Sequence, residues 1–208
     1  LGFCRSFHLN EYDRIEWMKP IMFTSGIGLI DDKNLYKEKI ESNMFIGKIG
    51  GPAYRIGFGG GSASSREISN SNNKLDYDAV QRDDPAMEEK MNRVISTCSK
   101  LDNNPILSIH DQGAGGNGNV LKEIIEKCGA KIDLGKITLG DKSMNDLEIW
   151  LSEYQESNAI LFKNKELLQK ICDREFVQLD IIGKTNNNDY ITIKNNDNII
   201  IDKYKLLD

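Results

Sequence analysis

The sequence has few of the residues that would assign it to several common classes of protein. It has only two histidines and four cysteines in 208 residues, and no run approaches the roughly 18 consecutive apolar residues of a membrane-spanning helix. No charged segment followed by an apolar segment opens the chain, so no secretory signal is visible. Basic residues are not in excess, since 27 Lys and Arg face 32 Asp and Glu for a net charge of −5, which argues against broad attraction to nucleic-acid phosphates.

The cysteines do not form a metal or redox motif. Their spacings match no zinc pattern, and the two histidines do not complete one. We therefore expect free thiols in a reducing cytoplasm. The residues concerned are Cys4, Cys98, Cys128 and Cys172, with His8 and His110.

The chain is expected to contain two parts. Its first residue is Leu1 rather than Met, and an apolar run follows, which indicates a piece of a longer polypeptide. A polar, charged stretch from Asp31 to Ser42 is typical of a connection. We expect residues 1–42 to be the end of a preceding domain with its connection, and residues 43–208 to form one α/β domain.

Within the second part, strand and helix patterns alternate. Expected strands are Met44–Ile49, Ile106–Ile109, Asn158–Phe162, Val177–Ile182, Tyr190–Ile193 and Ile199–Ile201. Asp84-Pro85 and Asn164 are expected to begin helices. A further helix is expected to run from Val120 to Cys128, with Gly129 as its left-handed cap.

Glycine is concentrated in two places. Seven of the 18 glycines lie between Gly47 and Gly61, and four lie between Gly113 and Gly118. Such clusters indicate that the backbone turns sharply or approaches another group closely.

The second cluster follows a strand that ends at His110-Asp111, and a helix is expected to begin after it. Ligands gather at the carboxyl ends of strands, and Asp111 stands where a hard metal ion bridging to phosphate oxygens would be held. The alternative is that Asp111 caps the turn and the glycines relieve steric strain. Spacing alone leaves both open.

The first cluster contains Arg55, whose guanidinium would fork onto either a phosphate or a carboxylate. The cluster itself either wraps a phosphate or lets two backbones cross. Gln81 precedes a helix start, where a polar side chain is either a cap or a ligand. Polar residues from Glu153 to Glu156 either form a solvated turn or line a site.

Four strings together resemble phosphoribosylformylglycinamidine synthase, in the long single-chain form of that enzyme. They occur in the family's order and cover about residues 43–163. They are GGPAYRIGFGGGSASS, LDYDAVQRDDPAMEEKMNRV, PILSIHDQGAGGNGNVLKE and LEIWLSEYQESNAIL.

The resemblance implies a fold and an activity. It implies an α/β domain like the carboxyl-terminal domain of aminoimidazole ribonucleotide synthetase, with a mixed sheet packed with helices, preceded by the tail of an amino-terminal-type domain. It implies an ATP-dependent, Mg²⁺-dependent ligase of purine biosynthesis that converts formylglycinamide ribonucleotide (FGAR) to its amidine with glutamine-derived ammonia. Such a step relies mainly on positioning and charge neutralisation.

Residue roles follow only from matched positions. Gln81 matches a substrate-binding glutamine in a QxGDP motif, although Asp83 replaces the glycine. Asp111 matches a magnesium ligand in a DxGAGG motif. Glu153, Tyr154 and Gln155 match a substrate-contacting ESQ, with tyrosine in place of serine.

Leu1, Gly2 and Phe3 match a segment that contacts an auxiliary nucleotide, ADP, rather than the reacting ATP. The family's catalytic histidine motif and its glutaminase domain have no counterpart in these 208 residues. We therefore expect no catalytic residue here, no turnover by this chain alone, and partners in the remaining domains of one cytoplasmic polypeptide.

Two alternatives remain at this stage. One is a related ATP-using enzyme, such as aminoimidazole ribonucleotide synthetase or selenophosphate synthetase. The other is a non-catalytic interaction module with purely structural glycine loops.

Overall fold

A computed structural model describes residues 2–8, 10–11, 13–22, 25–57, 84–125 and 128–205. The chain divides into two compact units, Leu1–Tyr36 and Lys37–Asp208. In the first unit, β1 (Gly2–His8) pairs antiparallel with β2 (Arg14–Met22), and a short 3₁₀ turn, η1, covers Asp32–Asn34.

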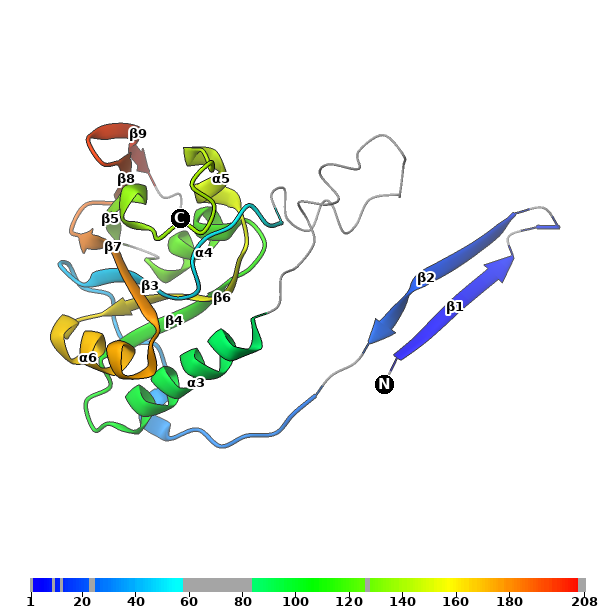
Figure 1. The fold of residues 1–208 in the computed structure, drawn as a ribbon, viewed down its shortest axis with the longest axis horizontal. Coiled ribbons are helices and arrows are strands. Elements are labelled where there is room, and N and C mark those ends of the chain that lie inside the picture. Colours follow the sequence, from blue (N-terminus) through cyan, green and yellow to red (C-terminus); the bar gives the residue numbers. More distant parts are fainter. Residues whose placement is uncertain are drawn as a thin grey trace. The chain divides into compact units, whose positions relative to one another are not determined.

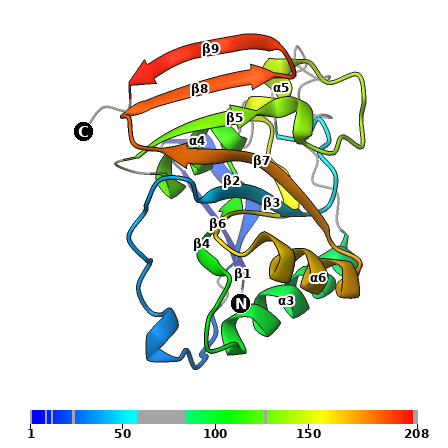
Figure 2. The ribbon, with the colours of Figure 1, turned by 90° about the vertical axis from the view of Figure 1, so that its left-hand side faces the viewer.

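In the described part of the second unit, seven strands form one mixed sheet in the order β4-β6-β3-β7-β5-β8-β9 (Figure 2). Neighbouring strands are antiparallel except for the parallel pair of β5 and β8. The strands are β3 (Phe45–Gly50), β4 (Ile106–Gln112), β5 (Gly129–Asp133), β6 (Tyr154–Phe162), β7 (Gln178–Asn186), β8 (Tyr190–Asn195) and β9 (Asn198–Lys205).

Helices cover both faces of this sheet (Figure 1). One face carries α3 (Pro85–Lys100) and α6 (Lys165–Glu175), and the other carries α4 (Gly116–Ile124) and α5 (Asp146–Leu151). A 3₁₀ turn, η2 (Leu134–Lys136), follows β5. No helix among the described residues is long and apolar enough to cross a membrane.

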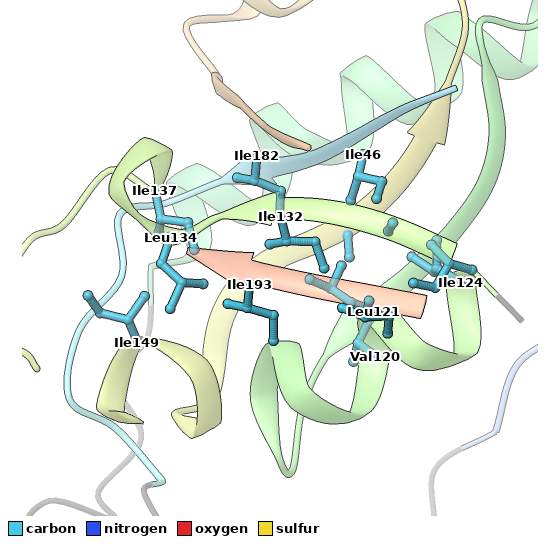
Figure 3. Packing of buried hydrophobic residues seen from close by; sticks show 14 of the residues in the cluster. Ile46, Val120, Leu121, Ile124, Ile132, Leu134, Ile137, Ile149, Ile182 and Ile193 are labelled. Atoms are coloured by element: carbon cyan, nitrogen blue, oxygen red, sulfur yellow. The ribbon is translucent and has the colours of Figure 1, made fainter. Parts of the chain in front are cut away.

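Strand alternation builds a separate core on each face. In β3, Ile46 joins the core under α4 and α5, whereas Ile49 joins the core under α3 and α6. Figure 3 shows the first of these cores, where branched side chains from strands and helices interdigitate. Both isoleucines are fully buried, so the sheet needs helices on both sides to exclude water from its apolar residues.

The helix starts predicted from sequence are confirmed. The Asp84 carboxylate accepts a hydrogen bond of 3.0 Å from the Met87 N–H, and Pro85 occupies the first turn of α3. The Asn164 side chain accepts the same kind of bond from Leu167 at the start of α6. The Asn195–Asn198 turn joins β8 to β9, with Asn196 in the left-handed region at φ 53°.

One predicted helix is wrong at its end. Helix α4 stops at Ile124 rather than at Cys128, and Gly129 is the first residue of β5. Gly129 has no positive φ, so it is not a left-handed cap. A Cβ there would overlap backbone oxygens of Asn188 and Tyr190, so the glycine is required by a close backbone approach between β5 and the β7–β8 turn.

Two strands extend further toward one end of the sheet than predicted. Strand β4 continues past Ile109 to Gln112, and β6 begins at Tyr154 rather than Asn158. These extra residues are polar, which hid them from the hydrophobic pattern. They are also the residues that carry the candidate site.

Candidate functional site

An open hollow of about 380 Å³ lies where β4 ends and β6 begins. Two sequence motifs that are about 40 residues apart meet there because β4 and β6 are neighbours in the sheet. Helix α3 supplies the remaining side. The hollow is lined by Glu88, Met91, Asp111, Gln112, Gly113, Glu153, Tyr154, Gln155, Glu156, Ser157 and Asn158.

A wide bulge in β6 shapes this hollow. Asp111 pairs with Asn158, but the next residue, Gln112, pairs with Tyr154, so residues 155–157 have no partner on β4. Glu156 within the bulge has φ 44°, a left-handed conformation unusual for a residue with a side chain. Bulges of this kind redirect side chains at strand ends and are frequent beside functional sites. Here the bulge forms one wall of the hollow.

Asp111 presents a largely exposed carboxylate at the rim of the hollow. Its side chain is 81% exposed, and one carboxylate oxygen lies 3.4 Å from Nδ1 of His110. Helix α4 begins without a side-chain cap, because left-handed Gly115 occupies the N-cap position. Asp111 therefore does not cap α4, and its exposed carboxylate is available to a ligand.

His110 has structural partners rather than a place in the hollow. Its Nε2 lies 2.8 Å from the Glu123 carboxylate on α4, and its Nδ1 lies 2.7 Å from the Asp111 carbonyl oxygen. The ring therefore links β4 to α4 directly behind Asp111.

Glu153 lies between the first hollow and a second one of about 250 Å³. Residues Glu153–Glu156 line both, and the second is completed by Gly51, Pro52, Tyr54, Ile56, Asp84 and Met87. The Glu153 N–H donates to the Ile56 carbonyl at 3.0 Å. One segment of β6 therefore contacts the loop after β3 and the end of β4 together.

Both glycine clusters pack against this same segment. Gly57, at φ 59°, leaves room for the Glu153 side chain, whose Cδ lies 2.5 Å from the position a Cβ would take. Gly50, at φ 119°, adjoins the Glu156 carbonyl in the same way, and Gly116, at φ 52°, adjoins Ser152. In the described residues the clusters therefore act by close approach, because a Cβ at any of these positions would collide with residues 152–157.

Arg55 binds a carboxylate of the protein itself. Its Nε lies 2.8 Å from one Glu148 oxygen, and a terminal nitrogen lies 3.2 Å from the other. Glu148 also completes a capping box with Asn145 at the start of α5. The Asn145 N–H, and after it Arg55, hold the pKa of Glu148 below its usual value. The phosphate alternative for Arg55 is therefore not supported, and the pair ties the loop after β3 to α5.

Tyr154 points inward. Its side chain is 4% exposed, and its hydroxyl donates to the Ile149 carbonyl at 2.5 Å. Burial raises the pKa of this phenol above its usual value. The ring thus supports the hollow from beneath, while its backbone contributes to the wall.

A buried amide network beneath the site was missed by sequence reasoning. The Gln112 Nε2 donates to Asn117 Oδ1 at 2.7 Å, and Asn117 Nδ2 donates to the same Ile149 carbonyl at 3.1 Å. Gln112 and Asn117 are 1% and 0% exposed. Both lie inside the glycine-rich motif, where nothing in the hydrophobic pattern indicates burial. The network connects β4, α4, α5 and β6.

The described residues offer a single carboxylate rather than a full set of metal ligands. Among the described residues, no group of three or more histidines, cysteines or acids is arranged to hold a metal ion. A magnesium ion needs only one or two protein carboxylates when phosphate oxygens and waters complete its shell. The exposed Asp111 carboxylate fits that role as a single ligand.

The remaining predicted site residues are placed as follows. Gln81 and Leu1 lie outside the described residues. Gly2 and Phe3 lie in β1, opposite Met22 and Ile21 of β2. The structure brings together Asp111, Glu153, Tyr154 and Gln155 around one hollow.

Comparison with known families places this architecture. Residues 46–194 match the family described as AIR synthase related protein, C-terminal domain. The match covers most of the chain, so the chain belongs to this family. The predicted fold class, a mixed sheet packed with helices, is confirmed.

Curated relatives give a more particular likeness. The chain is 50% identical over 197 residues to a probable phosphoribosylformylglycinamidine synthase, chloroplastic/mitochondrial, of Arabidopsis thaliana, covering 92% of the chain. It is 50% identical over 188 residues to phosphoribosylformylglycinamidine synthase of Homo sapiens, covering 88% of the chain. In each case it spans 14% of the relative's length.

Solved structures share the fold. A structure of T. maritima PurL complexed with FGAR aligns with TM-score 0.73 and 20% identity, over 83% of this chain and 29% of that one. Another of T. maritima PurL, complexed with ATP, aligns with TM-score 0.64 and 18% identity, over 82% and 26%.

Proposed function

We propose that this chain is the substrate- and metal-binding part of a phosphoribosylformylglycinamidine synthase. The whole enzyme would convert FGAR to formylglycinamidine ribonucleotide with ATP and glutamine-derived ammonia, as a ligase of purine biosynthesis. The observation that carries this proposal is that Asp111 and Glu153–Gln155 line the same hollow, the first of the two. Relatives of that name that are about half identical over most of the chain support it.

Asp111 would hold Mg²⁺ at the rim of the hollow. A magnesium ion there would neutralise charge on phosphate oxygens as a phosphoryl group moves. The exposed carboxylate at a strand end, beside the start of α4, supports this role. The other ligands would come from the nucleotide, from water and from other parts of the polypeptide.

Glu153 and Gln155 would bind FGAR, and Gln81 would join them. Asp84 lines the second hollow together with Glu153, so the start of α3 borders the same site. Tyr154 would take part through its backbone, because its side chain is buried and its hydroxyl is bonded to Ile149. These residues would orient the substrate rather than exchange protons with it.

Other parts of the proposal concern the surroundings of this segment. Leu1, Gly2 and Phe3 would contact an auxiliary ADP, and residues 1–42 would end a preceding synthetase-like domain, while residues 43–208 form the carboxyl-terminal-type domain. Further domains of the same polypeptide, a glutaminase among them, would supply ammonia. We infer a cytoplasmic enzyme without nucleic-acid or membrane partners.

The metal role is tested by Asp111→Asn in the complete synthase polypeptide. Loss of the charged ligand should raise the Mg²⁺ concentration needed for half-maximal activity at least about tenfold. Asp102→Asn is the matched control, since Asp102 is an exposed carboxylate near the other end of β4.

Equal Mg²⁺ requirements for both variants and the wild type would contradict the role of Asp111. The 208-residue chain alone should form no amidine, and turnover by it would contradict the proposal that it supplies only part of the active site.

A further inference from the structure

Lys48 is a charged residue at the centre of the sheet. It lies in β3, between β6 and β7, and its side chain is 0% exposed. The apolar strand pattern around it marks it as an exception, because lysines are seldom buried without a specific partner. Neither hollow is lined by Lys48 itself.

The ammonium has three kinds of contact. It donates a hydrogen bond to the Gly51 carbonyl, and it lies 3.8 Å from a carboxylate oxygen of Asp180 on β7. It also lies 5.8 Å from the centre of the Tyr154 ring, within the range of a cation–π contact. Ser157 donates to the same Gly51 carbonyl at 3.3 Å.

Apart from Asp180, the residues that contact the ammonium line one or both hollows, directly or through a hydrogen-bonded neighbour. Gly51 lines the second hollow, Ser157 lines the first, and Tyr154 lines both. Gly51 also donates its N–H to the Glu156 carbonyl at 3.1 Å. The buried ammonium therefore links the turn after β3 to the bulge of β6 from beneath the hollows.

We propose that Lys48 is a positioning residue whose buried charge fixes the Gly51 turn and the Tyr154–Ser157 wall in the geometry that binds FGAR. This rests on the proposed function, because it assigns Lys48 to the FGAR site. A residue that positions a binding wall affects the affinity for substrate more than the turnover of substrate already bound.

Among the described residues, the titratable groups that face Lys48 are Asp180 from β7 and the Tyr154 phenol from β6. Helices α4 and α5 contribute the uncharged Asn117 amide and Ile149 carbonyl beside Tyr154. The Asp180 carboxylate accepts hydrogen bonds from the Thr138 N–H at 2.9 Å and the Thr138 hydroxyl at 2.7 Å. It also accepts one from the Gln178 amide at 3.1 Å. Its position is thus fixed independently of Lys48.

The charge on Lys48 is sensitive to pH near neutrality. Burial lowers the pKa of this lysine to about 8, and the opposing attraction of Asp180 restores part of the difference. Above that pH the amine becomes neutral and the ion pair with Asp180 is lost. The binding wall should then loosen while the rest of the fold persists.

The test is the pH dependence of FGAR kinetics in the complete synthase. For the wild type, KM for FGAR should be constant from pH 7 to about 7.5 and should rise about tenfold by pH 9, because a group with this pKa is then about nine-tenths neutral. The kcat at saturating FGAR should change by less than about threefold over the same range.

Two variants separate Lys48 from other titrating groups. Lys48→Met should raise KM about tenfold at pH 7 and should show no further alkaline rise. Asp180→Asn removes the partner that keeps the lysine charged, so the rise in KM should begin at lower pH. Lys194→Met is the matched control, and its profile should match the wild type. Lys194 lies on β8, is 45% exposed and pairs at 3.2 Å with Asp133 of β5.

Wild-type KM that stays constant to pH 9 would overturn the proposal without any variant. So would Lys48→Met with normal KM at pH 7, or with an alkaline rise like that of the wild type. A wild-type protein that neither binds nor converts FGAR would instead contradict the proposed function, and the role of Lys48 at that site with it.

Discussion

At the scale of single residues, Tyr154 shows that a place in a binding motif does not determine where the side chain points. The residue stands between Glu153 and Gln155 in a segment that lines both hollows. Its buried hydroxyl nevertheless donates to the Ile149 carbonyl. The sequence shows where Tyr154 stands in its motif. The direction of its side chain depends on the bulge in β6, and no local sequence pattern predicts that bulge.

Tyr154→Phe should therefore affect stability more than binding. Removing the buried hydroxyl should lower the free energy of unfolding by about 1 kcal/mol, because the Ile149 carbonyl keeps only its bond from Asn117. KM for FGAR in the complete synthase should stay within about twofold of the wild type. Urea unfolding of the chain and steady-state kinetics measure the two effects.

The comparison variant is Tyr190→Phe, at a half-exposed tyrosine on β8, which should change neither quantity. A large rise in KM for Tyr154→Phe without loss of stability would show direct contact between the phenol and FGAR.

At the scale of structural elements, the pairing of β4 with β6 positions the site. Elements with strong hydrophobic patterns or caps were predictable, as in α3 with its Asp84 cap and α6 with its Asn164 cap. The polar ends of β4 and β6 were not, because their residues pair in the sheet without repeating an apolar alternation. The glycine clusters were visible in the sequence, but their structural role depends on the backbone and side chains of residues 152–157 that pack against them.

Adjacent glycines provide a test of the close-approach explanation. Gly50→Ala should lower the free energy of unfolding by about 2 kcal/mol or more, since φ is 119° and a Cβ would lie 2.9 Å from Ser157 Cα and closer still to the Glu156 carbonyl. Gly51→Ala should change it by less than about 1 kcal/mol, because its Cβ would meet only Met87 Cγ at 3.8 Å. Urea unfolding of both variants measures the difference.

Equal effects of the two alanine substitutions would show that the close approach of Gly50 to the bulge is not what requires glycine there. The pair is well matched because the two residues are adjacent in the chain and receive the same new side chain.

At the scale of the whole molecule, buried thiols make the stability of the fold depend on pH. Cys98 on α3 and Cys172 on α6 are fully buried and free. Burial raises the pKa of Cys98 to about 11 and that of Cys172 to about 12. The prediction of free thiols is confirmed for these two and for Cys128. Cys98 lies in α3, whose start was predicted, whereas Cys128 ends the predicted helix but lies beyond the observed end of α4 at Ile124.

These thiols should make the fold sensitive to alkali. Their folded-state pKa values lie above the ordinary value of 9.0, so the stability they contribute is present below pH 9 and is lost as pH rises toward 11. A variant with Cys98→Ala and Cys172→Ala should lose less stability between pH 9 and 11, with a slope smaller by about 2 kcal/mol per pH unit because two thiols no longer ionise on unfolding.

The comparison is one of slopes measured by urea unfolding, because the alanines also leave small cavities that lower stability at every pH. Between pH 7 and 8.5 the two slopes should agree. Identical slopes from pH 9 to 11 would mean that these thiols do not ionise on unfolding.

The most direct test of the account is a structure of the complete synthase with FGAR and Mg²⁺ bound. We predict that Gln81 and Glu153 lie within about 3.2 Å of polar atoms of FGAR, and that an Asp111 oxygen lies about 2.1 Å from the metal ion. FGAR bound elsewhere, with Gln81, Asp111 and Glu153 facing separate surfaces, would contradict the account.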